Sequence, residues 1–164
     1  MLPKTRETKL TQAIRKRPMH DLAYTIYQST ALIRASSKEH NKILKACQKH
    51  NPDNEITGFL HREQGFFLQY LEGPPDALDA TMFRISIDFR HNNLQVLDTG
   101  TLDRRRFPDW QMGFVNGGQL SLCDLLDVGP DRLNLKAEDP FDLVVFMTAN
   151  ADSLRHDISE LAIL

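Results

Sequence analysis

The chain has 164 residues, of which 41% are hydrophobic and 26% are charged, and these values suit one globular domain with an ordinary core. Its longest apolar stretch, Leu143–Met147, is far too short to span a membrane, and no secretory signal is visible near the N-terminus. Cys47 and Cys123 are isolated residues without metal-ligand spacing. We therefore expect reduced thiols in a cytoplasmic protein.

The charge is distributed unevenly along the chain. Residues 1–20 contain six Lys or Arg and one acidic residue, Glu7, so they carry a formal charge of +5. Because the whole chain carries −2, the other 144 residues carry −7. An acidic body is not typical of a nucleic-acid-binding protein. The basic segment suits contact with an acidic partner or with the body itself, but we expect a solvated, partly disordered extension.

The first part of the body predicts a strand followed by a helix. Leu22–Ser29 alternates in the manner of a strand and places Tyr27 on one face of it. Ser36 and Glu39 form a capping box, which predicts a helix from this point to about residue 49. Asn51 comes at the C-terminal end of the apolar stripe of that helix, just before a proline that stops it.

Two further strands, Glu55–Arg62 and residues 65–73, are separated by a short turn and predict a hairpin. The second strand is apolar on both faces, which is typical of a central strand covered on both sides. One face carries Phe67, Gln69 and Leu71, and the other carries Phe66, Leu68 and Tyr70. A buried amide without a partner costs about 1–3 kcal/mol, so Gln69 needs a partner in the folded protein.

The next segments predict a second helix and two more strands. Proline residues mark the entry of the helix. Its predicted buried stripe consists of Leu78, Met82, Ile85 and Phe89. After a predicted turn at Asn92-Asn93 come strands at Gln95–Leu102 and Trp110–Val115, with Arg104–Arg106 as a solvated strand end.

This order of elements, β-α-β-β-α-β-β, predicts an α+β protein with a ferredoxin-like sheet. Two helices cover only one face of such a sheet, so the other face needs a cover. The C-terminal extension, residues 116–164, offers helical segments at Leu120–Leu126, at Pro140–Thr148 with Asp139 as N-cap, and at Asp152–Leu164. We expect them to pack on the bare face or to form a subunit interface. The predicted division is a basic extension at 1–20, a domain at 21–115 and this helical extension.

Motifs for catalysis, nucleotide binding or metal binding are not evident. The glycines form neither G-x-G-x-x-G nor a P-loop, and the histidines and cysteines lack ligand spacing. Three polar residues, Tyr27, Asn51 and Gln69, are instead predicted to face one apolar space. Arg84, Asp88, Arg90 and His91 lie on or just after the second helix. These polar residues are either each other's partners or the lining of a pocket.

At this point the sequence resembles a known family. Tyr27-Gln28-Ser29, His50-Asn51, Ile56-Thr57-Gly58 and the strand 65–73 look like segments of a BLUF domain, and so do Asp88-Phe89-Arg90-His91 and residues 106–114. The likeness covers residues 21–115 in the family's order and spacing. BLUF domains are blue-light sensors that hold FAD non-covalently between the two helices of a ferredoxin-like fold. His61 replaces a usual aromatic residue, and residues 1–20 lie outside the family pattern.

The resemblance implies a role for each matched residue. Tyr27 is the redox-active tyrosine, and Gln69 is the switch amide between Tyr27 and the flavin, acting by rotation or tautomerisation. Asn51 hydrogen-bonds the pyrimidine edge of the flavin ring. His50, Arg84, Asp88, Arg90 and His91 occupy flavin-contacting positions of relatives. Trp110 and Met112 match the pair on the fifth strand whose rearrangement is linked to signalling.

The function implied by the resemblance is a short, stand-alone photoreceptor that binds FAD, or alternatively FMN, and signals through protein contacts. It is not expected to be an enzyme, to bind nucleic acid or to enter a membrane. We expect an unknown downstream protein partner and a homo-oligomer, most simply a dimer. Two other interpretations are a ferredoxin-like interaction module that has lost flavin and a small hydrolase of the acylphosphatase type.

Overall fold

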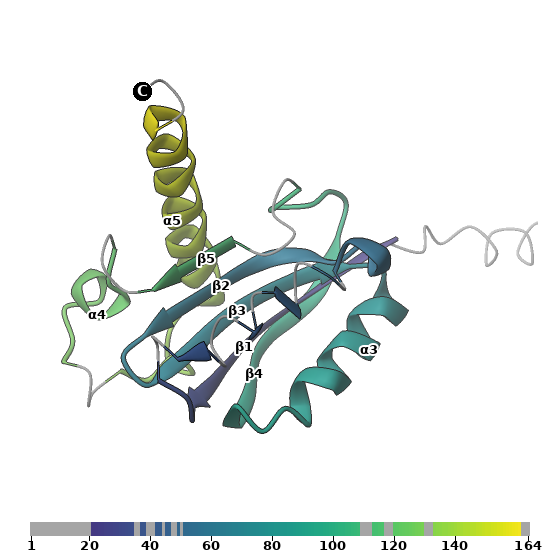
Figure 1. Ribbon diagram of the computed structural model, residues 1–164, viewed down its shortest axis with the longest axis horizontal. Helices are drawn as coiled ribbons and strands as arrows, with labels where there is room; N and C mark the ends of the chain where they lie inside the picture. Colours follow the sequence, from purple (N-terminus) through teal and green to yellow (C-terminus); the bar gives the residue numbers. More distant parts are fainter. Residues whose placement is uncertain are drawn as a thin grey trace, which may run out of the picture.

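The computed structural model describes residues 21–34, 37–38, 42–43, 45–46, 49, 51–108, 113–116, 120–129 and 133–161. Within these residues, five strands form one sheet in the order β4-β1-β3-β2-β5 (Figure 1). The strands are β1 (Leu22–Ala31), β2 (Thr57–Glu63), β3 (Phe66–Gly73), β4 (His91–Leu102) and β5 (Gly113–Asn116). β5 runs parallel to β2, and the other neighbouring pairs are antiparallel. This arrangement confirms the predicted ferredoxin-like sheet.

The helices lie on both sides of the sheet. α3 (Pro75–Ser86) packs against β1 and β3 on one face, and a proline at its first turn suits the helix entry (Figure 1). The described residues between 38 and 49 are helical, as expected, whereas the proposed cap residues Ser36 and Glu39 lie outside the described residues. A short 3-10 helix (Pro52–Asn54) leads into β2. The C-terminal extension contains α4 (Leu122–Leu125) and α5 (Pro140–Leu161).

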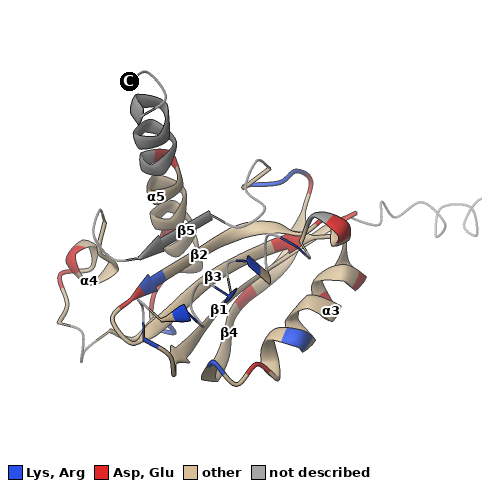
Figure 2. Cartoon of the chain, viewed as in Figure 1, with Lys and Arg blue, Asp and Glu red and all other residues tan. Residues whose placement is uncertain are grey.

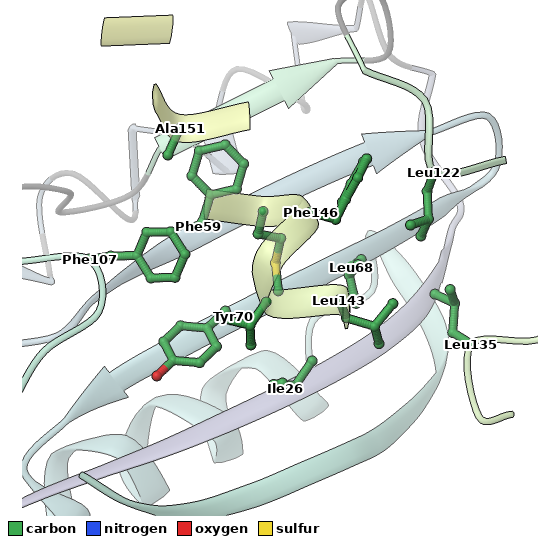
Figure 3. Close-up of a cluster of buried hydrophobic side chains, with 12 residues drawn as sticks. Ile26, Phe59, Leu68, Tyr70, Phe107, Leu122, Leu135, Leu143, Phe146 and Ala151 are labelled. Carbon is green, nitrogen blue, oxygen red and sulfur yellow. The ribbon is translucent and has the colours of Figure 1, made fainter. Parts of the chain in front are cut away.

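The sheet has a separate apolar core on each face, as the alternation in β3 predicts. Tyr27, Phe67 and Leu71 belong to the core on the α3 side. Leu68 and Tyr70 belong to the core on the opposite side (Figure 3). Residues of the C-terminal extension complete this second core, and they are Leu122, Leu135, Leu143, Val144, Phe146, Met147 and Ala151. The extension therefore covers the face that the two helices of the ferredoxin-like unit leave bare.

Three local predictions were wrong. β4 begins at His91 and not at Gln95, because Asn92 pairs with Thr30 of β1 and Asn93 adopts a positive φ of 51° within the strand. α3 ends at Ser86, so Phe89 lies beyond the helix and is 79% exposed, not part of a buried stripe. The two predicted segments after residue 139 form one continuous helix, α5. Asp139 caps the start of α5, as predicted, because Asp139 Oδ1 accepts a hydrogen bond of 2.8 Å from the backbone amide of Phe141.

Arg104–Arg106 follows the end of β4, and Arg104 and Arg106 are exposed, as a solvated strand end requires, but the main chain here is anchored to the sheet through Glu72. Glu72 is fully buried at the end of β3. Its carboxylate accepts hydrogen bonds from the backbone amides of Arg106 (2.8 Å) and Phe107 (2.7 Å). It also accepts bonds from Thr57 Oγ1 and the Tyr70 hydroxyl, both at 3.1 Å. Four donors compensate the loss of water around this carboxylate, and they fasten the segment after β4 to β3.

We predict that Glu72→Gln lowers the free energy of unfolding by about 2 kcal/mol, because an amide nitrogen would face backbone N–H donors that now point at a carboxylate oxygen. Denaturant unfolding followed by circular dichroism measures this. Glu55→Gln is the matched control, since Glu55 is exposed and the substitution changes charge equally. Equal stability of the two variants would contradict the anchoring role of Glu72.

Candidate functional site

A cavity of about 280 Å³ lies between the sheet and the helices on the α3 side. Its volume is close to the lower end of the range for ligand pockets, ~300–1,000 Å³. It is lined by Tyr27, Ser29, Ile43, Ala46, Asn51, Leu60, Phe67, Gln69, Leu71, Thr81, Arg84, Ile85, Asp88, Arg90 and His91. All seven site residues that were predicted from the sequence and lie in the described part of the chain are in this set. His50, Trp110 and Met112 lie outside the described residues.

Tyr27 and Gln69 are hydrogen-bonded to each other across two adjacent strands. They are directly paired in the register of β1 and β3, so both side chains point to the α3 side of the sheet. Their exposed fractions are 4% and 3%. The Tyr27 hydroxyl donates a hydrogen bond to Gln69 Oε1. The predicted partner of the buried amide is therefore Tyr27, and both residues also line the cavity.

Asn51 reaches the cavity from the turn before β2. Its backbone carbonyl accepts hydrogen bonds from the amides of Asn54 (3.2 Å) and Ile56 (2.9 Å), and this fixes the main chain at the helix end. Asn51 is buried and lines the cavity. A primary amide at this place offers two donors and one acceptor to a bound group.

Charged residues lie where α3 ends, on the side of the cavity formed by the helix. Figure 2 shows the basic position near the C-terminal end of α3, which is Arg84, and its Nη2 donates to Thr81 Oγ1 at 2.8 Å. Arg90 Nε donates to both carboxylate oxygens of Asp88, at 2.8 and 3.0 Å. Burial opposes ionisation of Asp88, but the hydrogen bonds from Arg90 outweigh it and hold the pKa of Asp88 below its ordinary value. This pair is therefore ionised and gives the cavity a fixed polar edge.

Two buried polar atoms of the cavity-lining residues have no hydrogen-bond partner among the described residues. His91 Nε2 lies 3.0 Å from the backbone carbonyl of Ile85, so in the neutral ring Nε2 carries the proton and Nδ1 is a bare acceptor. The other orphaned atom is Ser29 Oγ. Sequence reasoning placed Ser29 on the same strand face as Tyr27 but did not assign it to the site. Buried polar atoms without a partner are expected where a ligand supplies the missing hydrogen bonds.

The chemistry of the cavity suits a flat group that is apolar in the middle and polar at one edge. Leu60, Phe67, Leu71 and Ile85 supply apolar walls. The amides of Asn51 and Gln69 and the hydroxyl of Tyr27 supply donors and acceptors at its edge. The isoalloxazine ring of a flavin has this shape and this distribution of polar atoms, so the residues present fit it. Among the described residues, no cluster of three or more His, Cys, Asp or Glu could hold a metal ion, and no helix is both long and apolar enough to cross a bilayer.

Comparisons with known proteins show which family the chain belongs to. Residues 22–113 match the family described as sensors of blue-light using FAD, or BLUF. The solved dark-state structure of BlrB, a BLUF protein, is 31% identical with a TM-score of 0.67, and the likeness covers 80% of this chain and 98% of that one. A bacterial light-regulated adenylyl cyclase is also 31% identical, with a TM-score of 0.56 over 64% of this chain and 31% of that chain.

A curated relative is the photoactivated adenylate cyclase subunit beta of Euglena gracilis. It is 32% identical over 75% of this chain, and the chain spans only 15% of its length. The likeness to BlrB, in contrast, extends over nearly the whole of that BLUF protein. The chain therefore belongs to the BLUF family of flavin-binding blue-light sensors.

Proposed function

We propose that this chain senses blue light through the hydrogen bond between Tyr27 and Gln69 in a pocket that holds FAD. The observation that carries the proposal is the burial of this bond beside polar atoms that lack partners within the described residues. Asn51 and Gln69 would orient the polar edge of the flavin ring. Arg84 and Arg90 would lie toward its phosphate-bearing chain, which favours FAD or FMN over a neutral flavin.

The bound flavin supplies an acceptor that becomes strongly oxidising when it absorbs blue light. In the proposed cycle, Tyr27 gives up an electron and its hydroxyl proton and later recovers both, so the tyrosine ends the cycle unchanged. Gln69 now accepts the Tyr27 hydroxyl bond at Oε1. Its planar end carries both donors and an acceptor, so a rearranged amide can present a different group to the same neighbours. The lasting change is therefore in hydrogen bonding and not in covalent structure.

The size of this change limits how the signal leaves the pocket. One exchanged hydrogen bond contributes roughly 0.5–1.5 kcal/mol, whereas inverting a 1:99 equilibrium needs about 5.5 kcal/mol. The receiving element must then be close to balance before illumination. We propose that β5, which Trp110 and Met112 precede in the sequence, is one such element, and that a cytoplasmic protein partner reads the C-terminal extension.

We predict that Gln69→Leu retains flavin but loses the reversible red shift of its absorption band under blue light, because leucine offers no hydrogen bond to the ring. Difference spectroscopy of the purified protein measures this. A red shift of normal size in the variant would rule out the switch role of Gln69. A colourless wild-type protein would instead support the alternative of an interaction module without flavin.

Tyr27→Phe removes only the hydroxyl group, so the apolar packing of the ring on β1 is retained. We expect this variant to bind flavin and to lose the normal photocycle, because phenylalanine supplies neither the electron nor the proton. Transient absorption after a blue pulse tests this. Formation of the red-shifted state at the wild-type rate and yield would show that another residue is the donor.

We propose that the sensor is a homodimer held by the outer face of α5. Phe141 and Val145 are one helical turn apart and are 66% and 48% exposed. Exposed apolar residues at this spacing are typical of a helix that packs against a second copy.

The double variant Phe141→Ser, Val145→Ser is expected to halve the mass that light scattering reports for the wild type. Phe83→Ser on α3 is the control, since Phe83 is equally exposed on another surface. A monomeric wild-type protein at all salt concentrations would refute the dimer.

A further inference from the structure

Glu63, at the end of β2, fastens the start of α4 to the sheet. Its carboxylate accepts hydrogen bonds from the Ser121 hydroxyl and from the amides of Leu122 (2.6 Å) and Cys123 (3.2 Å). We call these four residues the Glu63 clasp. Glu63 is buried, and burial opposes its ionisation, but the hydrogen bonds from Ser121, His61 and the two amides prevail and lower the pKa of Glu63 to about 2. The clasp therefore contains a carboxylate that stays charged.

His61 connects the clasp to α5. It is fully buried, and its Nε2 lies 3.0 Å from Glu63 Oε2. Burial lowers the pKa of His61, so a neutral ring donates from Nε2 to the carboxylate. The ring also meets Phe146 edge-on, with 4.8 Å between ring centroids (Figure 3 shows Phe146 over the sheet). One side chain of β2 thus touches both parts of the C-terminal extension, through Glu63 at α4 and through Phe146 at α5.

The same strand also forms a wall of the cavity. Leu60, the residue before His61, lines the cavity and is directly paired with Gln69 in the register of β2 and β3. Consecutive residues of a strand point to opposite faces, so Leu60 faces the pocket while His61 faces the extension. A small displacement of β2 at Leu60 is therefore a displacement of His61 and of the hydrogen bonds that end at Glu63.

We propose that β2 transmits the state of Gln69 to the C-terminal extension, with His61 as the positioning residue and the Glu63 clasp as the contact that loosens in the light. The inference rests on the proposed function of Gln69. It adds a second route for the signal, which runs through β2, the strand paired with β3 beside Gln69. Hydrogen bonds weaken steeply with length and angle, so a shift of a few tenths of an ångström in β2 is sufficient to weaken three bonds at once.

Cys123 reports the state of the clasp. Its amide belongs to the clasp, its thiol is buried, and burial together with Glu63 raises the pKa of that thiol to about 11. A closed clasp therefore protects Cys123 from reaction with N-ethylmaleimide. Opening exposes the thiol and moves it away from the carboxylate, and both changes speed the reaction.

The experiment is to label the full-length, flavin-loaded protein with N-ethylmaleimide in the dark and under continuous blue light. Mass spectrometry of the peptide that contains Cys123 gives the rate. We expect light to speed labelling roughly tenfold, the effect of losing one hydrogen bond to a charged group. In His61→Leu the flavin band is expected to shift red normally while the light and dark rates become equal. Phe146→Leu, which keeps an apolar core residue, is the second test of the same contact.

Glu63→Gln is expected to label roughly tenfold faster in the dark, and the control is Asp124→Asn. Asp124 also lies near the thiol and raises its pKa, but its side chain is exposed and does not belong to the clasp. The proposal is overturned if the wild-type rate of Cys123 labelling is the same in the dark and in the light while the flavin band shifts red. It is also overturned if His61→Leu and Phe146→Leu keep the wild-type response to light. Absence of the red shift in the wild type would overturn the proposed function as well, so the two failures differ.

Discussion

The hydrogen bond between Tyr27 and Gln69 is the interaction on which the rest of this structure depends. It joins two paired residues of adjacent strands, it is buried, and it lies at the edge of the cavity between the sheet and the helices. A buried amide in an apolar strand is costly without partners, and the Tyr27 hydroxyl is one partner of Gln69. Under the proposed function, a bound flavin is another. The proposed function follows from this arrangement, because a change in the electronic state of the flavin would then alter the hydrogen bonds of Gln69.

The sheet separates the place where light acts from the place where a partner is expected. The cavity that we propose holds flavin is on the α3 side, whereas α4 and α5 cover the other side. A change in one hydrogen bond is small compared with the energy of a full conformational switch. Backbone alternation offers a way for a change in the cavity to reach the other face, because Leu60 and His61 are consecutive and face opposite sides of the sheet. The buried carboxylates Glu63 and Glu72 then hold the segments that follow β5 and β4 to the sheet by many weak bonds.

Much of the site could be predicted because its residues occur in short segments of regular structure. The period of two in β1 and β3 placed Tyr27 and Gln69 on one face, and the proline after Asn51 marked the helix end. The family resemblance added the residues near the end of α3. His91 was assigned to the site, but its place as the first residue of β4 was not foreseen. The positive φ of Asn93 and the early end of α3 before Phe89 depend on strand pairing and loop closure, which local pattern does not contain.

The sequence by itself determined the fold class, the alternation that creates two cores, and the identity of most of the polar residues that line the pocket, though not Ser29 or Thr81. The physical reason is that the spacing of apolar residues within a single segment already indicates its secondary structure and its buried face. Only the tertiary structure decided that Tyr27 is the partner of Gln69, that α5 is one helix lying on the bare face, and that His61, Glu63 and Glu72 are buried contacts. The partners of His61, Glu63 and Glu72 include residues 34 to 85 positions away in the chain, and a local pattern carries no information about which distant donor will meet a carboxylate.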